Sequence, residues 1–198
     1  MKIVLQELWQ ANLSWQFVKP ICLASQLVQP LPEVLSSKWR SFLTEIVLLQ
    51  QITFPRYVIL PKALVEIHAF FNASEKAYCA VLYARSISSD SIRIVLPRSK
   101  TRAAPLKVQS SPRLELCSVL LLSNLLSSTL PHLDISISAL FAWSDSQITL
   151  VWINSEPPRG KPFVANRVSK IQELVPEARW NFVRGLENPA DCGTSSNL

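Results

Sequence analysis

The sequence lacks the cysteine and histidine patterns that mark zinc sites and disulfide frameworks. No C-x-x-C pair occurs, and no histidine lies near any of the four cysteines, which are widely spaced: Cys22, Cys79, Cys117 and Cys192. Reduced thiols in an intracellular, cytoplasmic protein are therefore expected. The chain has two histidines, His68 and His132. His68 fits a hydrogen-bonded strand histidine better than a ligand.

Other absences narrow the functional classes further. No uninterrupted apolar run approaches the roughly 18 residues of a membrane span, so no membrane partner is predicted. The start, Met1 to Gln6, has one lysine and too short an apolar run for a signal peptide. Neither a D-T-G nor a D-S-G triplet occurs, so an aspartic protease is not predicted.

The composition is that of a folded, basic chain. It has 198 residues, 48% of them hydrophobic, which is enough for one sizeable core and an appendage. Lysine and arginine number 20 against 14 acidic residues, a net charge of +6 that favours a polyanionic partner such as nucleic acid. Six of these cations form a run without an intervening acid: Arg93, Arg98, Lys100, Arg102, Lys107 and Arg113. The run is either a solvated loop or a phosphate-contacting surface, and its position before Glu115 favours the surface.

The order of apolar patterns predicts a mixed α/β fold after an N-terminal connector. Prolines break up residues 1–61, where an amphipathic helix is expected over 36–50. Strands are expected next, over 65–71, 77–85 and 91–96, with short turns that imply an antiparallel meander. A helix over 112–130, a strand over 135–143, helices after 145 and over 164–174, and a strand over 180–183 complete the order. Trp143, Trp152 and Trp180 are predicted to be core residues.

One acid stands out in the long helix over 112–130. At about 100° per residue, Glu115 lies nine positions from Asn124 and so roughly opposite the polar side of the helix. Either Glu115 is a charge at the helix entrance that interacts with the helix dipole, or it is buried and needs a partner such as a cation.

Three further polar positions follow predicted strands or precede a late helix. Asn72 ends the first strand, Asp145 ends the fourth in the string WSDS, and Asp191 follows in NPAD. Asp145 and Asp191 each have a simpler interpretation, as a helix cap and a first-turn acid. Taken together, the four positions resemble the ribonuclease H arrangement, in which four carboxylates hold two divalent ions. Hard Mg²⁺ or Mn²⁺ prefers oxygen ligands, and two close ions need anionic neighbours.

A closer resemblance is carried by five strings in order: EIHAFFNASEKAY, PLKVQSSPRLELC, WSDSQITLVWI, PFVANRVSKIQEL and NPADCGTS. In order and spacing they resemble the Pol segment that follows the reverse transcriptase in BEL/Pao-type LTR retrotransposons, a region also described as a peptidase. The resemblance is strong over residues 66–195. It implies a ribonuclease H-like mixed five-stranded sheet over 62–198, shortened at its C-terminus, with residues 1–61 as the connector after a missing reverse transcriptase.

The resemblance also implies a site and shows where this chain departs from the family. Glu115, Asp145 and Asp191 match the family's metal-binding acids, whereas Asn72 stands where the family pattern F-x-D-A-S has the aspartate shared by both metals. Cys79 stands at a position where the family usually has glycine. The expected ancestral activity is hydrolysis of RNA in RNA/DNA hybrids with Mg²⁺ or Mn²⁺, weakened or lost here through Asn72. The alternatives are a non-catalytic nucleic-acid-binding or scaffolding module and an unexpressed relic.

Overall fold

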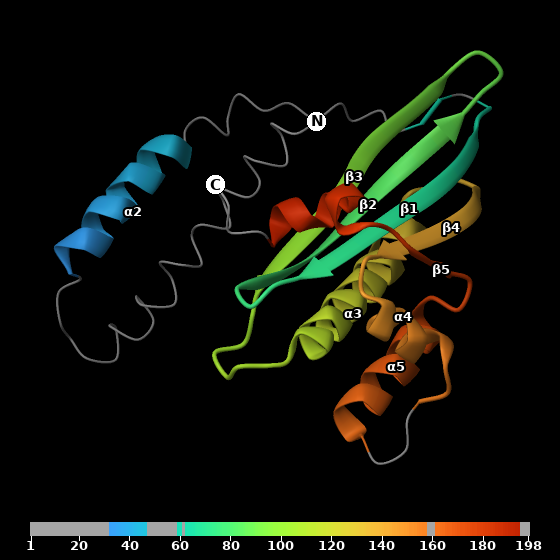
Figure 1. Cartoon of the computed structure of the whole chain (residues 1–198). Helices are drawn as coiled ribbons and strands as arrows, with labels where there is room; N and C mark the ends of the chain where they lie inside the picture. The colour runs from blue at the N-terminus through green and yellow to red at the C-terminus, as the bar shows by residue number, and fades with distance from the viewer. Residues whose placement is uncertain (1–31, 47–58, 61, 158–160, 195–198) are drawn as a thin grey trace. The chain divides into compact units, whose positions relative to one another are not determined.

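The computed structural model describes residues 32–46, 59–60, 62–157 and 161–194 (Figure 1). The chain divides into two compact units, residues 1–56 and 57–198. In the first unit, α2 (Glu33–Ile46) is an amphipathic helix in which Phe42 is buried and its ring centroid lies 5.5 Å from that of Trp39. The predicted helix over 36–50 is confirmed as far as Ile46, and its last four residues lie outside the described part of the chain.

The second unit is built on a five-stranded mixed sheet with the order β3-β2-β1-β4-β5. Strands β1 (Leu64–Ala73), β2 (Ala77–Ile87) and β3 (Ile92–Ala103) form an antiparallel meander. Strands β4 (Ile137–Ser144) and β5 (Arg179–Phe182) continue the sheet parallel to β1. The predicted ribonuclease H-like order of strands is confirmed.

Helices α3 (Ser111–Thr129), α4 (Gln147–Asn154) and α5 (Pro162–Leu174) follow in the predicted order. They lie on one side of the sheet in Figure 1. Three short 3₁₀ helices complete the unit: η2 (Leu130–His132), η3 (Gly185–Glu187) and η4 (Pro189–Gly193). By length and composition the segment Ser111–His132 could cross a membrane, but 61% of its most apolar window is buried within the fold, as in a core helix.

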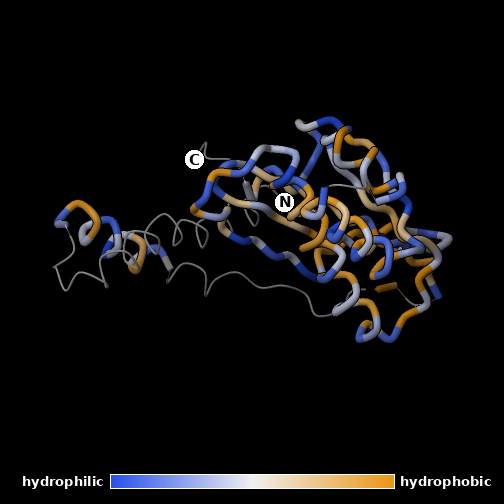
Figure 2. The backbone as a smooth tube through the Cα atoms, turned by 90° about the horizontal axis from the view of Figure 1, so that it is seen from below, coloured by the Kyte–Doolittle hydropathy of each residue, from blue (hydrophilic) through white to orange (hydrophobic). Residues whose placement is uncertain are grey.

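The alternation of strand residues divides the core into two parts. In β2, Ala80, Leu82 and Ala84 face α3 in the main hydrophobic cluster, whereas Cys79 and Val81 face the other side, where Ala190 of η4 packs on them. Hydrophobic residues, orange in Figure 2, accordingly recur along strands and helices between hydrophilic ones. The sheet is thus covered by α3 and α5 on one face and in part by η4 on the other.

The largest difference from the predicted elements concerns β3. This strand was predicted to end at 96 but pairs with β2 as far as Ala103. The apolar pattern in the sequence stops at 96, where polar and charged residues begin. The strand continues beyond this point because it is an edge strand, which pairs on one side only and can carry cations along its length. The alternative of a solvated loop is therefore excluded for Arg98, Lys100 and Arg102, which lie on the strand.

Candidate functional site

The ends of β1 and β4 bring two of the predicted residues to one edge of the sheet. The two strands are parallel, so their C-terminal ends lie side by side. Asn72 is the penultimate residue of β1, and Asp145 directly follows β4. The N-cap of α4 is Ser146, so the interpretation of Asp145 as a helix cap is wrong. Instead, Asp145 Oδ1 is buried and has no hydrogen-bond partner among the described residues.

Glu115 comes to the same edge from α3. Its side chain is only 6% exposed, and it lies beyond the first turn of α3, so the interpretation as a helix-entry charge is wrong. Its Oε2 atom is buried without a hydrogen-bond partner in the described part of the chain. Burial, and then the nearby Asp145 carboxylate, raise the pKa of Glu115 to about 8, while the backbone N–H of Ala73 acts in the opposite direction.

Both the nitrogen and the oxygen of the Asn72 side-chain amide form hydrogen bonds. Its Nδ2 donates to Asp191 Oδ1 over 2.9 Å and to Thr194 Oγ1 over 3.0 Å. Its Oδ1 accepts from the backbone N–H of Ala73 over 2.8 Å. A backbone N–H can only donate, so this contact fixes the orientation of the amide and turns its nitrogen towards Asp191. The side chain is 6% exposed, and its hydrogen bonds offset the cost of burying it.

Asp191 lies in η4, as the first-turn acid that its sequence context predicts. Asn188 caps η4 by accepting from the N–H of Ala190 over 3.1 Å, and its Nδ2 donates to the carbonyl oxygen of Phe71 over 3.0 Å. These bonds tie η4 to β1. Burial and the charge of Asp145 raise the pKa of Asp191, against the hydrogen bond from Asn72, which lowers it.

Asp145 interacts electrostatically with both of the other acids, Glu115 and Asp191. Its charge raises the pKa of both Glu115 and Asp191, yet within the described ranges no three His, Cys, Asp or Glu side chains form a group that could hold a metal ion. Glu115 Oε2 and Asp145 Oδ1 fit one divalent cation, because buried carboxyl oxygens without a donor are stabilised by positive charge. The Asp191 carboxylate differs, since one of its oxygens accepts from Asn72. A bound cation would favour the ionised form of Glu115 over the protonated form that its raised pKa favours.

The predicted basic residues occupy three places. Arg93, Arg98, Lys100 and Arg102 lie on β3, Lys107 lies between β3 and α3, and Arg113 lies in the first turn of α3. Arg98 donates from Nη1 to Thr129 Oγ1 over 3.0 Å, which joins β3 to the end of α3. A further cation, Arg167 of α5, lines the same cavity as Arg98. Sequence reasoning missed Arg167, because it lies 54 residues after Arg113 and belongs to no charge run.

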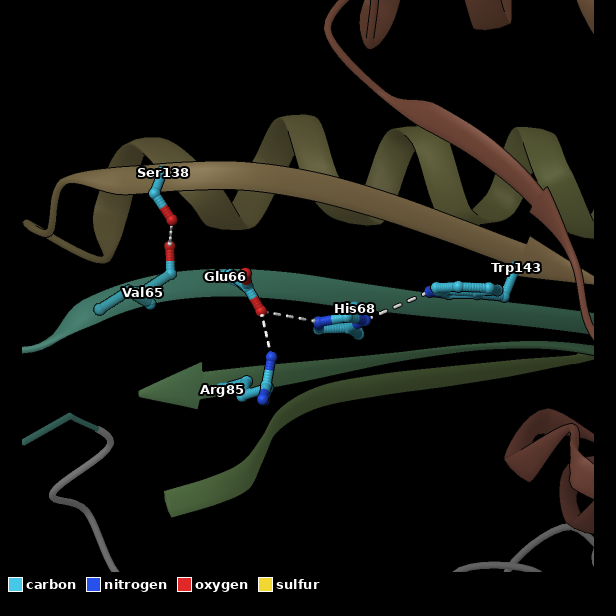
Figure 3. Close-up of polar contacts among 6 residues, drawn as sticks. All are labelled: Val65, Glu66, His68, Arg85, Ser138 and Trp143. Atoms are coloured by element: carbon cyan, nitrogen blue, oxygen red, sulfur yellow. Dashed lines mark hydrogen bonds and ion pairs between the residues drawn. The ribbon is translucent and has the colours of Figure 1, made fainter. Parts of the chain in front are cut away.

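The face of the sheet opposite α3 carries an aromatic cluster (Figure 3). Trp143 Nε1 donates to His68 Nδ1 over 3.3 Å, and His68 also contacts Glu66 Oε2 over 3.3 Å. Glu66 in turn accepts from Arg85 over 2.8 Å. The prediction of a hydrogen-bonded strand histidine is confirmed. Trp143, predicted as core, is half-buried and stacks on His68 outside the main cluster, which Trp152 and Trp180 do join.

Solved structures with related architecture include three nucleic-acid enzymes. Ribonuclease H1 of Halobacterium salinarum has a TM-score of 0.43 and 12% identity, with coverage of 63% of this chain and 90% of that chain. The N-terminal RNase H domain of a Mycobacterium tuberculosis protein has a TM-score of 0.40 and 14% identity, with coverage of 67% and 94%. Foamy virus protease-reverse transcriptase in complex with double-stranded DNA has a TM-score of 0.44 and 12% identity, with coverage of 87% and 34%.

Sequence comparison gives the family. No curated protein matches the chain. The sequence profile described as "Pao retrotransposon-like RNaseH-like domain" matches residues 1–146, which is more than half of the chain. The match includes Asn72, Glu115 and Asp145 and ends before Asp191. The chain therefore belongs to the Pao retrotransposon-like RNaseH-like domain family.

Proposed function

We propose that this domain descends from a two-metal hydrolase of RNA in RNA/DNA hybrids and that its own hydrolytic activity is weak or lost. The observation that carries the proposal is the orientation of the Asn72 amide. Its nitrogen donates to Asp191, and its oxygen accepts from the N–H of Ala73. A side chain in this arrangement stabilises the Asp191 carboxylate by hydrogen bonding, and its oxygen has one lone pair left after the bond from Ala73 and brings no negative charge to a cation.

The loss of charge at position 72 is large enough to matter. At an effective dielectric near ~20, two unit charges ~4 Å apart interact by about 4 kcal/mol, an upper limit before compensation. Because about 1.4 kcal/mol corresponds to a tenfold change in affinity, part of this loss would weaken metal binding by more than tenfold. The ancestral site, with an aspartate here, would need the ions to hold its carboxylates together.

Glu115 and Asp145, with Asp191 next to them, are the residues that would hold Mg²⁺ or Mn²⁺. Both Glu115 Oε2 and Asp145 Oδ1 are buried without a donor in the described part of the chain. When bound, such an ion lowers the pKa of a coordinated water and offsets charge on the leaving oxygen. The protein's part is to keep the two carboxylates buried and oriented at the ends of β4 and α3.

A hybrid-cleavage assay tests the proposal. Wild type and Asn72→Asp are compared on a labelled RNA/DNA hybrid with Mg²⁺ or Mn²⁺, and Asn154→Asp serves as control for an amide-to-acid change at an exposed position of α4. We expect turnover by Asn72→Asp above that of wild type and of Asn154→Asp. Equal turnover by wild type and Asn72→Asp would defeat the claim of an impaired site. An Asn72→Asp protein that folds but stays inactive would count against the assignment of the whole acidic site.

The alternative function is a non-catalytic nucleic-acid-binding or scaffolding module. It is favoured by the placement of Arg98, Lys100 and Arg102 on one face of β3, a surface that requires no metal. In either case we propose the same setting: an intracellular, cytoplasmic location within a Pol polyprotein of the BEL/Pao type. Residues 1–61 would then connect residues 62–198 to a reverse transcriptase domain.

A further inference from the structure

A basic cavity lies beside α3, apart from the acidic edge of the sheet. Its volume is about 600 Å³, and its lining includes four cations and no acidic residue: Arg98, Lys100, Arg102 and Arg167. In the described part of the chain, none of the four forms an ion pair with a carboxylate. Like charges around one hollow repel each other, so a bound anion would stabilise the arrangement.

The spacing along β3 suits a repeating anion. Arg98, Lys100 and Arg102 pair with Leu82, Ala80 and Tyr78 of β2, so all three lie on the α3 side of the sheet. Residues two apart on a strand are separated by roughly 6.6 Å, which is about two base steps at roughly 3.4 Å per step of one nucleic-acid strand. The three cations are exposed, so their charged ends can reach a ligand.

Arg167, which also lines the cavity, is held in place by Phe163 of the same helix. Its Nη1 donates to the carbonyl oxygen of Phe163 over 3.1 Å, and its guanidinium lies 3.6 Å from the centre of the Phe163 ring. Its Nε is buried and has no hydrogen-bond partner among the described residues. Arg113 lies over the same ring at 4.9 Å. The guanidinium is thus fixed, and the Nη protons that the Phe163 carbonyl does not use are the ones suited to bind a phosphate, because Nε is buried.

We propose that this cavity binds phosphate groups of a nucleic-acid backbone through Arg167 of α5 together with the cations of β3. The proposal rests on the proposed function for the choice of nucleic acid as ligand, but it needs neither a metal ion nor an active site. It assigns binding to a surface that combines residues far apart in the sequence. Arg93, Lys107 and Arg113 lie outside the lining and are not part of this site.

The test measures binding of a labelled RNA/DNA hybrid to the full chain in EDTA at several salt concentrations. Arg167→Gln is compared with Lys170→Gln, which removes one positive charge from an exposed position of the same helix outside the cavity. We expect the slope of log affinity against log salt to fall by about 0.9 in Arg167→Gln, as for the loss of one phosphate contact, and to stay unchanged in Lys170→Gln. Replacing Arg98, Lys100 and Arg102 together by Gln should lower it by roughly 2 to 3.

Three results would overturn the proposal. One is a slope for Arg167→Gln equal to that of wild type, and another is an equal decrease in Lys170→Gln. The third combines these slopes with the effect of inorganic phosphate alone on the melting temperature. If phosphate raises the melting temperature of wild type but not of Arg167→Gln, while the two proteins have equal salt slopes for the hybrid, the cavity is a site for free phosphate. Arg167→Lys keeps the positive charge. A salt slope equal to that of wild type in this variant supports a charge contact between position 167 and a phosphate, and it argues against misfolding as the cause of the smaller slope in Arg167→Gln. Because EDTA removes metal, failure here is separate from failure of the cleavage test.

Discussion

The Asn72 amide nitrogen lies 2.9 Å from Asp191 Oδ1 and donates a hydrogen bond to it, across 119 positions of sequence. This bond joins the end of β1 to η4, and a second bond from the same nitrogen reaches Thr194 Oγ1 over 3.0 Å. A carboxylate at position 72 could accept but not donate at pH 7, so it would repel Asp191 in the absence of a cation. The structure thus joins the end of β1 to η4 through an amide, at the position where the resemblance implies a metal-binding aspartate.

The first prediction concerns stability without metal. Asn72→Asp removes a hydrogen bond to a carboxylate and adds a charge beside Asp191, so the free energy of unfolding in EDTA should fall by about 2 kcal/mol. Added Mg²⁺ should recover part of this loss in the variant and change wild type less, since a ligand stabilises the state that binds it. Chemical denaturation with EDTA and with Mg²⁺ measures both effects. Asn154→Asp, at an exposed position of α4, should show neither effect. An Asn72→Asp protein as stable as wild type in EDTA would contradict the prediction.

The second prediction concerns pH. The pKa of Glu115 rises from 4.5 in the unfolded chain to about 8 in the folded protein. Between these values the unfolded chain has released a proton that the folded protein keeps, so the free energy of unfolding falls as pH rises from about 4.5 to about 8. Glu115→Gln cannot lose this proton, so its unfolding free energy should depend less on pH in that range. The raised pKa of Asp191 acts with the same sign from 3.8 upward and leaves a smaller dependence.

Urea denaturation of wild type and Glu115→Gln at pH 5, 6, 7 and 8 checks this prediction. Glu187→Gln, an exposed acid in η3, is the matched control and should keep the pH dependence of wild type. Parallel curves for wild type and Glu115→Gln would show that the folded protein does not hold a proton on Glu115.

The third prediction concerns the close approach of η4 to β2. A Cβ atom at Gly193 would overlap Cys79 Sγ and lie 2.9 Å from Cys79 Cβ, so the two backbones come together only because position 193 has no side chain. Gly193→Ala should destabilise the protein by about 1 to 3 kcal/mol. The cost should be smaller when Cys79 is replaced by Gly, which a double-mutant cycle from thermal denaturation measures. Additive effects of the two substitutions would exclude this contact as the cause.

The sequence was sufficient for the order of strands and helices, because apolar periodicity is a local signal. It placed Glu115 opposite Asn124 but left open whether Glu115 is buried or is a charge at the helix entrance. It could not show that Asn72 bonds to Asp191, since this contact depends on where η4 packs against the sheet. The full length of β3 was also missed, because its cations resemble a loop until an edge strand places them on one face. Arg167 joins these cations only through the packing of α5 on α3, which no spacing in the sequence records.

The aromatic cluster shows a similar limit. An apolar setting around Trp143 predicted a core residue, but strand alternation puts it with His68 and Phe70 on the face opposite α3. Which face of β4 carries the main core is decided by the pairing with β1, where Ala142 is opposite Ala69 and Trp143 opposite Phe70. Periodicity gives two faces, and only tertiary packing decides which of them the helices cover.

Calorimetric titration of Mn²⁺ into wild type and Asn72→Asp tests the central claim most directly. The account predicts that Asn72→Asp binds Mn²⁺ at least about tenfold more tightly than wild type, because restored negative charge worth ~1.4 kcal/mol or more acts at the ends of β1 and β4. Adding Glu115→Gln to Asn72→Asp should remove most of this gain. Equal affinities for wild type and Asn72→Asp would contradict the claim that Asn72 is what separates this site from a metal-binding one.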